Sequence, residues 1–115
     1  MAAAFFNAAA DPRKARAISA GTHPALHVHP SVIEAMREAG VDLGSSRPQA
    51  LTAELAARAQ WLITMGCGES CPVVPGARVE DWPIFDPANQ PIERVRAIRD
   101  EVYARVARFI QRERL

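Results

Sequence analysis

The chain has 115 residues, 49% of them apolar, and a net charge of +1. This is the length of one ordinary domain with a single core, so we expect residues 1–115 to form one domain. Its longest apolar runs are far shorter than the ~20 residues that cross a bilayer. Arginines and carboxylates alternate along the C-terminal stretch instead of forming a basic block. We therefore expect neither a membrane protein nor a nucleic-acid-binding protein.

The N-terminal residues favour a cytoplasmic protein, because they contain neither a basic leader nor an apolar region as long as a secretion signal needs. They are rich in alanine, and Asp11-Pro12 follows as a stop, which predicts a short helix over about residues 1–10. Residues 15–21, which end in a glycine, predict a short strand.

The middle of the chain reads as loop, helix, loop, helix and strand. Pro30 suits the first turn of a helix that Gly40 would end. Thr52 is placed to cap a second helix, running to about residue 59, by accepting a backbone N–H. Residues 61–65 are apolar apart from one threonine, which predicts a strand covered on both faces, as in a parallel sheet.

The last third predicts a weak strand over residues 78–82, a turn over 85–89 and a long helix from Pro91 to Arg112. In that helix apolar residues recur three and four apart, as in an amphipathic helix packed on a core. Helices that alternate with short apolar strands indicate an α/β fold, here a three-layer sandwich with a mainly parallel sheet.

Two cysteines, Cys67 and Cys71, stand four residues apart directly after the predicted strand 61–65. In open parallel sheets, ligands bind beyond the carboxyl ends of the strands, so this is a suitable place for chemistry. A turned loop would bring the two thiols within disulfide reach, which favours a reversible dithiol. Two inert thiols, or a thiol pair that binds a soft metal or arsenite, stay open as alternatives.

Three histidines, His23, His27 and His29, lie in a proline-bounded loop. With the cysteines they could form a zinc site of mixed nitrogen and sulfur ligands. None of the usual paired ligand spacings is complete, so exposed loop histidines are the favoured interpretation and we expect no bound metal or cofactor.

Asp86 precedes Pro87 in the predicted turn, among apolar residues. Asp-Pro is common in turns, and from the residues alone a structural role is favoured. The alternative is a carboxylate that donates a proton to a leaving group. The 115 residues contain no Cys-x5-Arg sequence, no glycine-rich phosphate loop and no nucleotide-binding motif.

Several segments, in order and spacing, resemble the arsenate reductases related to low-molecular-weight tyrosine phosphatases. The resemblance covers essentially the whole chain, and its Cys-Pro-Val-Val-Pro-Gly and Asp-Pro segments are typical of the reductase branch. The matching segments are Ala20-Gly21-Thr22, residues 32–37, residues 63–67, residues 71–76, residues 80–82 and Asp86-Pro87.

The resemblance implies a low-molecular-weight phosphatase-like α/β fold. In that family a first strand leads into a Cys-x5-Arg loop that wraps the oxyanion, and the next helix opens with Met-Ala, as Met1-Ala2 does here. The strand and the loop are missing from these 115 residues. By the same resemblance, Cys67 and Cys71 match the resolving cysteines and Asp86 matches the general acid. The substrate would be arsenate or a phosphate-like oxyanion.

We therefore expect an arsenate reductase-like protein that reduces arsenate to arsenite in arsenic detoxification and is inactive as this chain alone. An external reductant, thioredoxin or a small thiol, would regenerate it. One alternative is a non-catalytic descendant that binds arsenite, a metal or a partner through its thiols. Another is a tyrosine phosphatase, although the tyrosines usual before Asp86 are absent. The missing central strand also leaves strand edges through which a homodimer could form.

Overall fold

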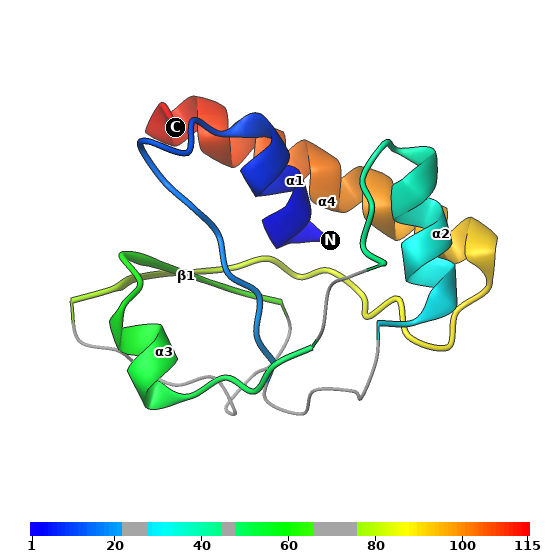
Figure 1. Cartoon of the computed structure of the whole chain (residues 1–115), viewed down its shortest axis with the longest axis horizontal. Coiled ribbons are helices and arrows are strands. Elements are labelled where there is room, and N and C mark those ends of the chain that lie inside the picture. Colours follow the sequence, from blue (N-terminus) through cyan, green and yellow to red (C-terminus); the bar gives the residue numbers. More distant parts are fainter. Residues whose placement is uncertain (22–27, 45–47, 66–75) are drawn as a thin grey trace.

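The computed structural model describes residues 1–21, 28–44, 48–65 and 76–115. Helices and strands are gathered into layers around a small sheet. Figure 1 shows α1, α2 and α4 on one side of the strands and α3 on the other. The predicted α/β class with parallel strands is confirmed. The elements are α1 (Ala2–Ala9), α2 (Pro30–Glu38), α3 (Ala53–Ala57), β1 (Trp61–Thr64), β2 (Arg78–Asp81) and α4 (Ile92–Glu113).

Strands β1 and β2 pair in parallel, with Trp61 opposite Arg78 and Thr64 opposite Asp81. All four residues of β1 keep partial exposure, so the prediction of a strand covered on both faces was wrong. Trp61 and Ile63 pack on the core that includes Phe109 of α4. On the other side of the strands, the one described helix is the five-residue α3, which offers far less apolar surface (Figure 1). The strand is half-buried for that reason.

The strand predicted over residues 15–21 does not form. The Ala17 N–H donates to Asn7 Oδ1 at 2.8 Å, and the Ala17 carbonyl accepts from Asn7 Nδ2 at 3.0 Å. An isolated parallel bridge joins Gly21 to Ala50. The Asn7 side chain thus satisfies both backbone groups of Ala17, and residues 15–20 form no ladder with a described strand.

Helix α4 supplies the apolar stripe on which α1 and α2 pack, as its spacing predicted. Phe109 joins the helices to the sheet, because its ring lies 5.2 Å from the ring of Trp61 and 6.1 Å from that of Trp82. The buried residues of α4 are Val95, Ile98, Val102, Val106 and Phe109.

Helices α2 and α3 begin where the sequence predicted them. Helix α2 begins at Pro30, and Gly40 follows its end with φ +84°, a conformation that glycine adopts without strain. The Thr52 hydroxyl accepts a hydrogen bond from the Leu55 N–H at 3.0 Å, which confirms the predicted cap of α3. Among the described residues, no helix is both long and apolar enough to cross a membrane.

Candidate functional site

The carboxyl ends of β1 and β2 lie at the same edge of the sheet because the strands are parallel. A hydrogen bond from Thr64 Oγ1 to Asp81 Oδ1, 2.6 Å long, joins the two last residues. Met65 directly follows β1, and Trp82 directly follows β2. Two chain segments therefore leave the sheet side by side at the edge where the sequence predicted chemistry.

The segment after β2 is held firmly on the core. The Trp82 N–H donates to the Thr64 carbonyl at 2.7 Å, and the Trp82 indole N–H donates to Glu80 Oε2 at 2.6 Å. That bond, with a further one from Arg112, lowers the pKa of Glu80 below its ordinary value. Trp82 and Ile84 are buried, so the chain reaches the turn that follows in a fixed direction.

A pocket of about 250 Å³ opens where these segments meet helices α1 and α4. The side chains that line it are apolar apart from Asp86, which is the one ionisable side chain among the described residues that line it. The lining consists of Met1, Ala2, Met65, Ile84, Phe85, Asp86, Pro87, Ile98 and Val102.

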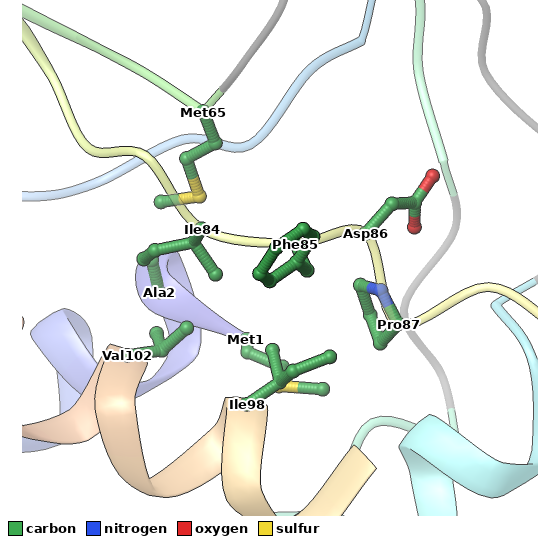
Figure 2. A pocket seen from close by; sticks show the side chains of 9 residues that line it. All are labelled: Met1, Ala2, Met65, Ile84, Phe85, Asp86, Pro87, Ile98 and Val102. Carbon is green, nitrogen blue, oxygen red and sulfur yellow. The ribbon is translucent and has the colours of Figure 1, made fainter. Parts of the chain in front are cut away.

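Asp86 stands at the rim of this pocket. Its Oδ1 accepts a hydrogen bond from the Ala88 N–H at 2.9 Å, which is the turn geometry expected of Asp before a reversing chain. Figure 2 shows the carboxylate directed away from the apolar floor formed by Ile98 and Val102. The side chain is exposed, so it is accessible to a ligand at the pocket mouth. The structural and the catalytic interpretations of Asp86 are thus compatible with each other.

Cys67 and Cys71 lie outside the described residues, and so do His23 and His27. Their predicted roles stay predictions. Met65, however, is the last described residue before the segment that holds both cysteines, and it lines the same pocket as Asp86. The fold therefore brings the start of that segment to the pocket of the predicted acid. In the described part of the chain, no group of three potential metal ligands occurs.

Two residues beside the pocket, Phe85 and Arg94, were not predicted from the sequence as part of the site. Phe85 is 69% exposed, and the Arg94 guanidinium carbon lies 5.1 Å from the centre of its ring. No local signal separates an aromatic residue that turns outward from one that turns into the core. Only the burial of Trp82 and Ile84 determines that Phe85 is left at the surface.

Residues 1–114 match the low molecular weight phosphotyrosine protein phosphatase family. The chain belongs to this family. Membership agrees with the resemblance found in the sequence. The family name refers to tyrosine phosphatases, and individual relatives say more about the reaction.

Those relatives are arsenate reductases by name. A Halobacterium salinarum protein with the provisional name arsenate reductase is 38% identical over 89 residues, which cover 77% of this chain and 63% of that protein. A thioredoxin-dependent arsenate reductase of Corynebacterium glutamicum has a similar structure, with a TM-score of 0.80 and 31% identity over 96% of this chain. The match covers 52% of the Corynebacterium chain. This chain therefore spans under two thirds of both relatives.

An arsenate reductase from Archaeoglobus fulgidus has a TM-score of 0.77 and 26% identity. The match covers 96% of this chain and 87% of that one. The fold is thus shared with arsenate reductases of different organisms.

Proposed function

We propose that this chain belongs to an arsenate reductase of the cytoplasm that converts arsenate to arsenite with thiols as the source of electrons. One observation carries the proposal. Met65, two residues before Cys67, and Asp86 line the same pocket at the carboxyl edge of the sheet. The residue that leads into the thiol segment and a carboxylate that could donate a proton thus share one pocket, and a thiol and a proton donor are two of the parts that the reaction needs. The arsenate reductase names of the relatives support the choice of oxyanion.

The reaction requires a first thiolate that attacks the arsenic of bound arsenate while one oxygen leaves as water. Asp86 is exposed at the pocket rim and would donate the proton to that oxygen. A second thiol, Cys71 or Cys67, would then attack the sulfur bound to arsenic. Arsenite leaves as arsenic accepts two electrons, and the first thiol and the attacking thiol become one disulfide. The other thiol of the pair would then attack that disulfide and release the first thiol, which leaves a Cys67–Cys71 disulfide.

The first thiolate and the guanidinium that holds the oxyanion are expected in a Cys-x5-Arg loop, which these 115 residues do not contain. Arsenate is mostly a dianion at neutral pH and needs backbone N–H donors and an arginine to be held against a thiolate. We therefore expect turnover only when such a loop precedes Met1.

The reductant that restores the thiols is a protein of the thioredoxin class or a small thiol. The Corynebacterium relative is thioredoxin-dependent, which favours the protein reductant. Specific observations also support two other functions. The cysteine pair favours thiol-dependent binding of arsenite or a metal without turnover, and the family name favours phosphatase activity.

The deciding experiment measures arsenate-dependent NADPH consumption by the 115-residue chain and by a version with a Cys-x5-Arg loop added before Met1. Each is assayed with thioredoxin and with small-thiol reducing systems. Turnover by the extended version alone supports the proposal. Arsenite binding without turnover in either version favours the binding protein, and hydrolysis of p-nitrophenyl phosphate without arsenate reduction favours the phosphatase.

A homodimer through β1 is a further part of the proposal. The Gln60 carbonyl accepts a hydrogen bond from the Arg78 N–H of β2, and the Thr64 carbonyl accepts one from the Trp82 N–H directly after β2. The N–H and C=O groups of Trp61 and Ile63 therefore point to the opposite edge of β1. No strand of the described residues pairs with that edge, and an unpaired edge can bind another strand. Sedimentation over a range of concentrations tests this, and a monomer at all of them argues against the dimer.

A further inference from the structure

Phe85 is exposed although Trp82 and Ile84, on the same segment, are buried. It is 69% exposed, more than any other large apolar side chain among the described residues, and it lines the pocket next to Asp86. Met65, on the same pocket, is 39% exposed. Figure 2 shows the Phe85 ring between Met65 and Asp86. Leaving large apolar side chains in water forgoes the stabilisation that burial gives, so two of them at one pocket mouth indicate a contact surface.

Arg94 adds a cation to this surface. Its guanidinium carbon lies 5.1 Å from the centre of the Phe85 ring, within cation–π distance. In the part of the chain that the structure describes, no carboxylate forms an ion pair with Arg94. By contrast, Arg96, Arg99, Arg105 and Arg112 of the same helix each form at least one ion pair. Arg94 also stands in the first turn of α4, where the helix dipole disfavours a positive charge. Arg94 is therefore held beside Phe85 by the ring contact, with its charge available to a carboxylate of another molecule.

The three side chains are of the types that protein interfaces favour. Phenylalanine, methionine and arginine are enriched at such interfaces relative to the rest of a protein surface. A small polar thiol would cover little of the apolar surface of Phe85 and Met65, whereas a protein would cover both. The occupant that fits is therefore a protein with an apolar spot and a neighbouring carboxylate.

We infer that Met65, Phe85 and Arg94, the Phe85 surface, form the docking site of a dithiol reductant protein of the thioredoxin class. The inference rests on the proposed function. Phe85 and Met65 would pack on the apolar rim around the reactive cysteine of the reductant, and Arg94 would pair with a carboxylate of the reductant. Met65 precedes Cys67 by two residues, so a protein docked here is next to the thiol segment along the chain.

The step served by docking is thiol–disulfide exchange. The two thiols of the reductant become a disulfide, and two electrons and two protons pass to the Cys67–Cys71 disulfide, which becomes two thiols. No other oxidant or reductant takes part in this exchange. It requires no arsenate, so it can be measured separately from arsenate turnover.

The experiment uses the full 115-residue chain, oxidised at its cysteines. The rate of its reduction by a bacterial thioredoxin is divided by its rate with dithiothreitol, so that changes in the disulfide itself cancel. For Phe85→Ala and Arg94→Glu, we expect this ratio to fall about tenfold, as for truncation of central interface residues. The fall for Arg94→Glu should shrink at high salt.

Matched controls are available on the same chain. Arg108→Glu makes the same charge change at an exposed position on α4, about 21 Å along the helix from Arg94. Val79→Ala truncates a 54% exposed apolar side chain on β2. Both controls should leave the ratio within about twofold of the unaltered chain, as substitutions outside an interface do.

The inference is overturned if Phe85→Ala and Arg94→Glu match their controls, or if thioredoxin reduces the unaltered chain no faster than dithiothreitol does. It is also overturned if reduction by a small thiol such as glutathione falls as strongly as reduction by thioredoxin. Failure of arsenate turnover would instead count against the proposed function, because thiol exchange does not depend on arsenate.

Discussion

Thr64 Oγ1 donates a 2.6 Å hydrogen bond to Asp81 Oδ1, and this bond joins the last residue of β1 to the last residue of β2. Met65 and Trp82 follow these two residues directly. The bond thus sets the separation of the two chain segments that lead to the pocket, one toward the cysteines and one toward Asp86.

Replacement of Thr64 by valine should destabilise the protein by about 1 kcal/mol, the usual net value of one hydrogen bond. Valine keeps the shape of threonine and its preference for strands, so the change removes chiefly the bond. The free energy of unfolding in urea measures the effect. Thr64→Ser keeps the hydroxyl and is the control, and equal stability of the two variants would show that the bond contributes nothing.

Replacement of Asp86 by asparagine should reduce arsenate turnover by about a hundredfold or more, as expected on loss of a general acid. Asparagine can still accept the Ala88 N–H, so stability should change little. The rate is measured in the version that carries the Cys-x5-Arg loop. Asp42 accepts the Gly44 N–H in the same way but does not line the pocket, so Asp42→Asn is a matched control. Equal loss in both variants would refute a chemical role for Asp86.

Glu38 should make stability depend on acid pH. Hydrogen bonds from Arg96 and then Arg99 lower the pKa of Glu38 below its ordinary value of 4.5. Folding therefore favours the carboxylate, so its contribution is complete above pH 4.5 and is lost as the pH falls through the lower folded value. Urea midpoints measured from neutral pH downward should fall more steeply for the unaltered protein than for Glu38→Gln.

The control for this pH dependence is Glu54→Gln, which alters an exposed carboxylate on α3 without an ion pair among the described residues. Its pH profile should stay parallel to that of the unaltered protein. Parallel profiles for Glu38→Gln as well would mean that the contact between α2 and α4 through Glu38 has no electrostatic part.

Replacement of Met36 by alanine should destabilise the protein by about 2 to 5 kcal/mol, because it opens a cavity in the core. Met36 is 0% exposed, on the face of α2 that packs against α4. Met36→Leu keeps the volume and should cost less than about 1.5 kcal/mol. Thermal and urea unfolding of the two variants provide the comparison. Similar losses for both would indicate that shape, and not the cavity, determines the cost.

Much of the helical structure could be predicted because its signals are local. The apolar spacing of α4, the Thr52 cap of α3 and Pro30 at the start of α2 each act within a few residues of the chain. Strand formation is different, since a strand exists only where a neighbour bonds its backbone. Residues 15–21 have a plausible strand sequence, yet the Asn7 side chain bonds Ala17 and no ladder forms.

The sequence by itself determined the α/β class, the family resemblance and the residue types available for chemistry, because these depend on order and local pattern. Only the tertiary structure decided that Met65 and Asp86, 21 residues apart, line one pocket. It also decided that Phe85 faces water beside Arg94 while Trp82 and Ile84 are buried. These relations depend on parallel pairing of β1 with β2 and on packing against α4, which bring distant parts of the chain together.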